Sequence, residues 1–293
     1  MRRMSWALII HGGAGRLAAG RREAARSGCA AALEAGCAVL ARGGSALDAV
    51  EAAVRVMEDD PVFNAGYGSV LNAAGEVELD AAIMDGATLD VGGVAAVQGV
   101  RHPVSVARRL VRERPILLAG EGARAFAARR GAELCAPEDM IHPDRRTAMP
   151  GGNDTVGAVA LDAAGNLAAA GSTGGLAGKM PGRIGDTPIP GAGLYADNAR
   201  GGVALSGEGE AIARLTLAAR IMDGLAGGGA PQAAVESAVA RLAALGEGGA
   251  IALSRAGLFG WAHNAPDFTV GLARDDLPPR VHLSKAEEED EAG

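Results

Sequence analysis

The chain has 293 residues, of which 48% are hydrophobic and only 3% aromatic, and its formal net charge is −7. This length provides a large core and suits one domain or two closely joined layers. The acidic balance argues against nucleic acid as a partner. The 45 glycines favour tight turns and close packing of helices on sheets.

The cysteines and the N-terminus indicate a cytoplasmic protein. Cys29, Cys37 and Cys135 are an odd, low number, which predicts a reducing compartment without a disulfide framework. The sequence has no Cys/His cluster with metal-ligand spacing. The apolar run at residues 7–10 is too short for a signal peptide or a membrane span, so we expect no membrane partner.

The first half of the chain is predicted to mix strands and helices. Ser45 has the position of an N-cap, and apolar residues at helical spacing follow it until Pro61 ends the helix. Further predicted helices cover residues 21–40, 102–112 and 121–130, and predicted strands cover residues 6–10, 78–84 and 95–97.

Residues 136–153 are rich in proline, glycine and charge, and predict a linker. Two apolar runs follow, 155–161 and 166–172, joined by a turn signal that predicts a β-hairpin. If this turn is centred between Ala163 and Ala164, Thr155 lies opposite Ser172 and beside Thr173.

The last part predicts a second group of strands. A strand at 202–205 leads into SGEG at 206–209, and a helix is expected over 210–223, whose N-terminus favours developing negative charge. Strands are also expected at 250–254, 259–263 and 268–273, and residues 285–293 read as a disordered acidic tail. Strands in both halves with helices outside predict stacked sheets between helical layers.

Thr155 is a candidate nucleophile only under a special condition. A threonine hydroxyl needs a base, and the α-amine of an N-terminal threonine, with a pKa of about 7.7–8.0, can serve as one. Cleavage between Asp154 and Thr155 would create that N-terminus. Taken alone, Thr155 is better interpreted as an ordinary hairpin threonine. Residues 13–18 loosely match a dinucleotide fingerprint, which leaves a nucleotide-binding module as a remote alternative.

A set of motifs resembles the isoaspartyl peptidase and plant-type asparaginase family of threonine N-terminal-nucleophile hydrolases. The motifs are HGGAG at 11–15, FNAGYGS at 63–69, ELDAAIMDG at 78–86, TVGAVALD at 155–162, STGG at 172–175 and GRIGDTP at 182–188. The resemblance implies an α+β fold, a four-layer αββα sandwich in a single domain. It also implies self-cleavage into an α subunit, 1–154, and a β subunit, 155–293, assembled as a dimer of αβ units.

The resemblance further implies a role for each matching residue. Thr155 would attack the β-aspartyl carbonyl while Thr173 orients it. Arg183 would hold the substrate's α-carboxylate, Asp186 its α-ammonium, and Asn64 would support the nucleophile. Ser206 and Gly207 would form the oxyanion site. The full substrate-binding set is Arg183, Ile184, Gly185, Asp186, Ser206, Gly207, Glu208 and Gly209. A structural sodium is expected on the backbone carbonyls of Met57, Glu58, Asp60, Phe63, Ala65 and Tyr67.

Two positions depart from the family pattern. Ser206 stands where threonine is usual, and Asp154 stands where glycine is common in this subgroup. The predicted activity is hydrolysis of isoaspartyl dipeptides and, less efficiently, of L-asparagine, with no organic cofactor. Asp154 keeps glycosylasparaginase and threonine aspartase open as alternatives, and a precursor that never cleaves is another.

Overall fold

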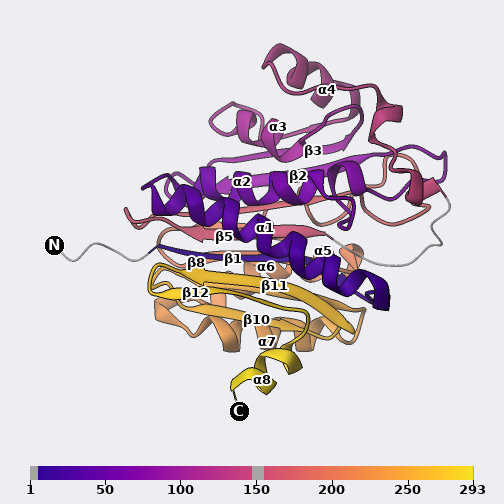
Figure 1. Ribbon diagram of the computed structural model, residues 1–293. Helices are drawn as coiled ribbons and strands as arrows, with labels where there is room; N and C mark the ends of the chain where they lie inside the picture. The colour runs from indigo at the N-terminus through magenta and orange to yellow at the C-terminus, as the bar shows by residue number, and fades with distance from the viewer. Residues whose placement is uncertain (1–5, 147–154, 293) are drawn as a thin grey trace.

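In the computed structural model, which describes residues 6–146 and 155–292, two sheets lie face to face between outer helices (Figure 1). The first sheet contains β1 (Ala7–Gly15), β2 (Leu79–Asp85), β3 (Val91–Val97), β4 (Leu117–Ala119), β5 (Val156–Leu161), β6 (Leu167–Thr173), β11 (Asp267–Arg274) and β12 (Leu277–His282). The second contains β7 (Leu194–Asp197), β8 (Gly201–Gly207), β9 (Gly248–Ser254) and β10 (Phe259–His263). Within the described residues the strand orders are β12-β11-β1-β5-β6-β2-β3-β4 and β10-β9-β8-β7.

The helices form the two outer layers. They are α1 (Arg22–Ala41), α2 (Ala46–Asp59), α3 (Pro103–Leu110), α4 (Gly120–Arg129), α5 (Gly209–Leu215), α6 (Leu217–Gly224), α7 (Pro231–Leu242) and α8 (Lys285–Ala292). Helices α1 to α4 contact the first sheet, and α6 and α7 contact the second. As predicted, Ser45 caps α2, its side chain accepting a hydrogen bond from the Asp48 amide at 3.1 Å.

Three hydrophobic clusters correspond to the three interfaces of a four-layer sandwich. Alternate residues of a strand point to opposite faces, so Leu8 and Ile10 of β1 join the cluster under α1 and α2, while Ile9 joins the cluster between the sheets. In β9, Ile251 joins the inter-sheet cluster and Ala250 packs toward α6 and α7. The predicted αββα sandwich is therefore the observed fold.

The β5–β6 hairpin forms with a register one residue away from the prediction. Val156, not Thr155, pairs with Ser172, and Leu161 pairs with Leu167. The side chain of Asp162 causes the shift, because its Oδ1 accepts hydrogen bonds from the amides of Ala164 and Asn166, both at 2.9 Å. Extending the observed register by one residue places Thr155 opposite Thr173.

Two other elements differ from the sequence prediction. The helix expected over 210–223 is broken into α5 and α6 at Thr216, which adopts a left-handed conformation (φ 48°). The break lets the amides of Ala218 and Ala219 bond to the carbonyls of the 191–192 loop. The acidic tail expected to be disordered forms α8 instead.

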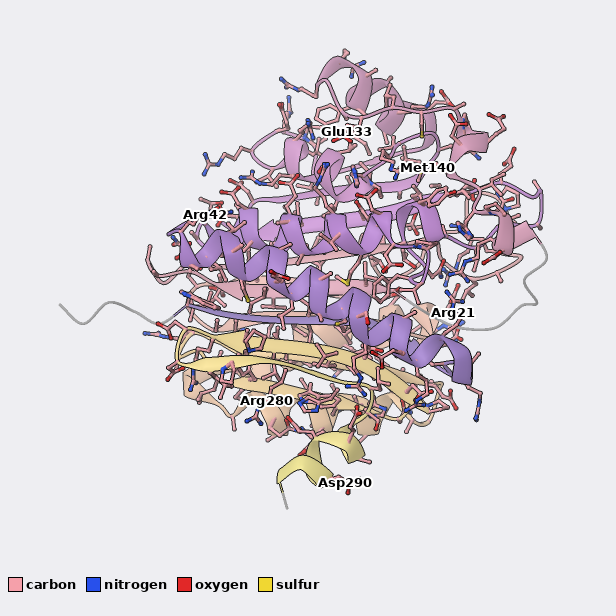
Figure 2. All side chains as sticks on the ribbon, in the orientation of Figure 1. Arg21, Arg42, Glu133, Met140, Arg280 and Asp290 are labelled. Carbon is pink, nitrogen blue, oxygen red and sulfur yellow. The ribbon has the colours of Figure 1, made fainter. Side chains whose placement is uncertain are left out.

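Ion pairs and an aromatic contact hold α8 against the sheets. Glu287 pairs with Arg26 of α1, and Glu288 accepts a hydrogen bond from the Trp261 indole at 3.1 Å. The Lys285 ammonium lies 4.5 Å from the centre of the same indole ring. Figure 2 shows α8, marked by Asp290, at the opposite end of the molecule from Glu133.

We predict that Asp162→Ala lowers the free energy of unfolding by about 2–4 kcal/mol. The buried carboxylate also accepts a bond from the Ala46 amide at 3.2 Å, so its loss leaves amides of both the hairpin turn and the start of α2 unpaired. Urea unfolding measures the effect. The control Asp162→Asn keeps the Oδ1 acceptor and should lose clearly less. A loss below about 0.5 kcal/mol for the alanine variant would contradict this account of the turn.

Candidate active site

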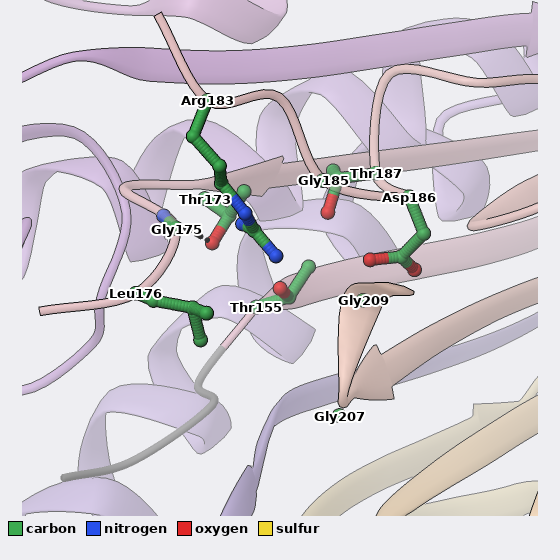
Figure 3. A pocket seen from close by; sticks show the side chains of 10 residues that line it. All are labelled: Thr155, Thr173, Gly175, Leu176, Arg183, Gly185, Asp186, Thr187, Gly207 and Gly209. Carbon is green, nitrogen blue, oxygen red and sulfur yellow. Dashed lines mark hydrogen bonds between the residues drawn. The ribbon is translucent and has the colours of Figure 1, made fainter. Parts of the chain in front are cut away.

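Thr155 and Thr173 line one cavity at the end of the β5–β6 hairpin (Figure 3). The hairpin supplies Thr155 and Thr173, and the loop between β6 and β7 supplies the charged residues. Gly207 comes from the end of β8 and Gly209 from the start of α5. The lining residues are Thr155, Thr173, Gly175, Leu176, Arg183, Gly185, Asp186, Thr187, Gly207 and Gly209. Three threonines, an arginine and an aspartate therefore line one small space.

Ser206 ties the first residue of the hairpin to the second sheet. The Ser206 hydroxyl oxygen accepts a hydrogen bond from the Thr155 amide at 3.1 Å and another from the Ala14 amide, at the end of β1, at 3.0 Å. Ser206 is fully buried behind the cavity wall, while Gly207 reaches the cavity. Gly207 has a φ of 145°, and an added Cβ would lie 2.4 Å from the Glu247 carbonyl, so only glycine fits there.

Asn64 holds the loop that follows Thr173. The Asn64 side-chain amide donates to the Gly175 carbonyl at 2.7 Å, and the Asn64 backbone carbonyl accepts from the Gly174 amide at 2.9 Å. The Gly175 amide in turn donates to the Thr173 hydroxyl at 3.0 Å, the dashed line in Figure 3. Asn64 therefore supports the threonine pair through the backbone, from outside the cavity.

Arg183 lies between glycines and points toward Thr155 (Figure 3). An added Cβ at Gly185 or at Gly209 would come within 2.9 or 3.0 Å of the guanidinium nitrogens. The absence of side chains at these two positions leaves room for the guanidinium at the cavity wall. Its Nε and Nη2 donate to Glu210 at 2.8 and 2.6 Å.

Asp186 lines the cavity and has one carboxylate oxygen without a hydrogen-bond partner among the described residues. It is 4% exposed, and that oxygen is Oδ2. Desolvation by burial raises the pKa of Asp186 to about 7. A buried carboxylate without a partner costs free energy when ionised, so this group is poised to accept a cation.

A buried carboxylate and a buried ammonium support the loop that carries Arg183. The Asp80 carboxylate accepts from the Ala96 amide at 2.7 Å and, more weakly, from Gly185 at 3.4 Å. Burial raises the pKa of Asp80, and the positive charge of Lys179 opposes that rise. The Lys179 ammonium donates to the Glu78 carbonyl at 3.0 Å. These contacts hold the loop in place without entering the cavity.

His11 is a buried residue of β1, not the loop histidine that the sequence suggests. Desolvation lowers its pKa to about 3, so the imidazole is neutral at physiological pH. An added Cβ at Gly157 would lie 2.3 Å from His11 Nε2. The glycine of the TVGAV motif is therefore required to fit the ring beneath β5.

The structure brings most of the predicted site residues together. Ile184 and Glu208 stay outside the cavity lining, and Asp154 lies outside the described residues. Leu176, Thr187 and Glu210 were missed. Glu210 follows the SGEG motif directly, which was a usable signal, whereas nothing in the sequence marks Leu176.

The dinucleotide alternative does not fit the fold. A dinucleotide fingerprint requires a strand, a helix and a second strand that runs parallel to the first. Here β1 pairs antiparallel with both of its neighbours, β5 and β11. The glycines at 12, 13 and 15 lie within β1 itself.

Comparison with known proteins points to one family. The family model described as asparaginase matches residues 4–151 and 142–282. The isoaspartyl peptidase/L-asparaginase of Rattus norvegicus is 46% identical over 231 residues, which cover 73% of this chain and 69% of that protein. The Danio rerio protein of the same name is 44% identical, with 80% of each chain covered. A probable isoaspartyl peptidase/L-asparaginase of Drosophila melanogaster is 39% identical, with 92% of each covered.

We predict that Asp186→Asn stabilises the protein in a pH-dependent way. Because the folded-state pKa is raised above the unfolded value, wild-type stability falls as pH rises through about 7. The variant lacks this loss, so the stability gap between the two proteins should widen by on the order of 2 kcal/mol from pH 5 to pH 8. Urea unfolding at both pH values tests this, with the exposed Asp290→Asn as control. A gap that is independent of pH would contradict it.

Proposed function

Because the chain belongs to the asparaginase family, we propose that it hydrolyses the β-aspartyl bond of isoaspartyl dipeptides and the side-chain amide of L-asparagine. One observation carries the proposal. Thr155 shares a cavity with a guanidinium and with a buried carboxylate that lacks a partner among the described residues. An aspartyl group carries an α-carboxylate and an α-ammonium, so these two side chains complement both of its charges.

The nucleophile would be the Thr155 hydroxyl. Once Thr155 is an N-terminus, its own amine can take the hydroxyl proton as the oxygen attacks the β-carbonyl. The proton then passes to the leaving amine, and a β-aspartyl ester to Thr155 remains. Water, activated by the same amine, hydrolyses that ester and releases aspartate. Thr173, across the hairpin, would orient the hydroxyl.

The developing negative charge needs donors. The backbone amide at Gly207 and the hydroxyl of Ser206 are the candidates for the oxyanion site. The hydrogen bonds that Ser206 accepts from Ala14 and Thr155 fix the position of its oxygen beside the nucleophile. A serine can therefore serve where the family usually has threonine.

Substrate recognition would fall to the β6–β7 loop. Arg183 would bind the α-carboxylate and Asp186 the α-ammonium. Since burial raises the pKa of Asp186 to about 7, the ammonium would bind the ionised form and keep it ionised. β-Asp-Leu, L-asparagine and GlcNAc-Asn, offered side by side, distinguish this activity from that of a glycosylasparaginase.

We predict that purified protein, incubated and then denatured, yields two fragments that result from cleavage of the Asp154–Thr155 bond. Both fragments should be needed for β-Asp-Leu hydrolysis. Thr155→Ala should remain one inactive chain, because it lacks the hydroxyl that would attack the preceding bond. Intact mass spectrometry reads the result. Two fragments from the alanine variant, or an active uncut wild type, would contradict the proposal.

We propose that two αβ units assemble, and that the protein acts in the cytoplasm.

A sodium ion at the loop after α2 is also part of the proposal. Its ligands would be the backbone carbonyls of Met57, Glu58, Asp60, Phe63, Ala65 and Tyr67. The loop is tight, since an added Cβ at Gly66 would lie 2.3 Å from the Glu58 carbonyl oxygen. The carbonyls at positions 60 and 65 each accept one amide hydrogen bond, which leaves each a lone pair for a cation. Arg145 competes at Phe63, where its guanidinium donates at 3.3 Å.

We predict a higher melting temperature in sodium chloride than in choline chloride of equal ionic strength, because the cation would bind only the folded loop. At a sodium concentration ten times the Kd of one site, binding raises the free energy of unfolding by about 1.4 kcal/mol. Arg145→Ala, which frees the Phe63 carbonyl, should enlarge the difference. Equal melting temperatures in both salts, for wild type and variant alike, would rule the site out.

A further inference from the structure

Glu210 forms a two-point ion pair with the only arginine that lines the cavity among the described residues. Its Oε1 and Oε2 accept hydrogen bonds from Arg183 Nε at 2.8 Å and Nη2 at 2.6 Å. Glu210 itself does not line the cavity. Its side chain is 43% exposed, against 15% for Arg183, so it approaches the guanidinium from the solvent side.

The pair leaves one edge of the guanidinium for the cavity. An arginine has five N–H donors in a plane, and Glu210 uses one on Nε and one on Nη2. The remaining nitrogen, Nη1, lies against two glycines of the cavity lining, since an added Cβ at Gly185 or Gly175 would be 2.9 or 3.3 Å from it. The Nη1–Nη2 edge can therefore bind a second carboxylate with two parallel hydrogen bonds.

We propose that Glu210 is a positioning residue, which fixes Arg183 so that its Nη1–Nη2 edge faces Thr155 and so makes a free α-carboxylate a requirement for substrates. This inference rests on the proposed β-aspartyl hydrolase function. Without Glu210, the long arginine side chain would sample several rotamers and would have to lose that freedom on each binding event. The hydrogen bonds from Arg183 lower the pKa of Glu210 to about 2, so the pair stays ionised at neutral and mildly acidic pH.

An opposing effect must be weighed. Glu210 also places a negative charge near the substrate's own carboxylate, so its removal would lessen a repulsion. That repulsion acts through a partly exposed group and is screened by solvent and salt. The orientation of Arg183 acts directly on two short hydrogen bonds to substrate. Loss of orientation therefore dominates, and binding should weaken.

Steady-state kinetics on processed enzyme test the proposal. For β-Asp-Leu, Glu210→Ala should raise KM about tenfold and change kcat less than about twofold, because the pair acts on binding. Glu210→Gln retains the shape and one acceptor oxygen, so its KM should rise less. Glu133→Ala is the matched control, since it removes a partly exposed glutamate that pairs with Arg55 at 2.8 Å, far from the cavity. Its KM should match the wild type.

A double-mutant comparison separates positioning from a general structural effect. In an Arg183→Ala background, Glu210→Ala should change KM less than about twofold, since nothing remains to be oriented. Calorimetry with L-aspartate and with β-alanine, which lacks the α-carboxylate, gives a second readout. Glu210→Ala should weaken L-aspartate binding about tenfold and leave β-alanine binding unchanged.

The outcomes distinguish this inference from the proposed function. A processed wild type without β-aspartyl hydrolase activity refutes the proposed function. An active wild type whose Glu210→Ala variant has an unchanged or lower KM refutes only the role of Glu210. An equal effect in the Arg183→Ala background also refutes that role. Intact mass confirms processing of each variant, and Glu210→Gln decides the matter if the alanine variant fails to fold.

Discussion

The two hydrogen bonds accepted by Ser206 determine where the site can form. This hydroxyl belongs to the second sheet, and it binds amides at the end of β1 and at the start of β5 in the first sheet. It therefore aligns the two sheets at the edge where the hairpin begins. Thr155 and Gly207 can share a cavity only because the two sheets meet there. Glycines such as Gly202 let the sheets approach closely, since an added Cβ at Gly202 would lie 2.5 Å from Val159 of the other sheet.

The charges around the cavity are arranged by burial. Arg183 donates two hydrogen bonds to Glu210 on its solvent side, whereas Asp186 is buried and its Oδ2 has no hydrogen-bond partner within the described chain. Above the Asp186 pKa of about 7, the ionised and desolvated carboxylate makes the free protein less stable. A bound ammonium would offset that cost. Lys179 and Asp80 are also buried but do not line the cavity, and the positive charge of Lys179 opposes the rise that burial causes in the pKa of Asp80.

The sequence allowed the architecture to be predicted, and it singled out most of the residues that line the cavity, because periodicity and motifs are local signals. The N-cap at Ser45, the hairpin and the layered sheets are of this kind. The hairpin register was missed by one residue because the Asp162 side chain, not the centre of the turn, sets it. The break at Thr216 was missed because its cause is the distant 191–192 loop. The Arg183–Glu210 pair was missed because it joins residues 27 positions apart, although Glu210 itself directly follows the SGEG motif.

The cavity lining also explains why selectivity can be strict for one half of a substrate and loose for the other. Among the described lining residues, Arg183 and Asp186 carry the only charges, and an aspartyl group would engage both. No charged lining residue then remains to choose the leaving group. Ile184 and Met180, on the same loop, are 39% and 76% exposed and do not line the cavity. Ammonia and an amino acid can both leave from such a site, and the relatives' double name, isoaspartyl peptidase/L-asparaginase, combines just these two reactions.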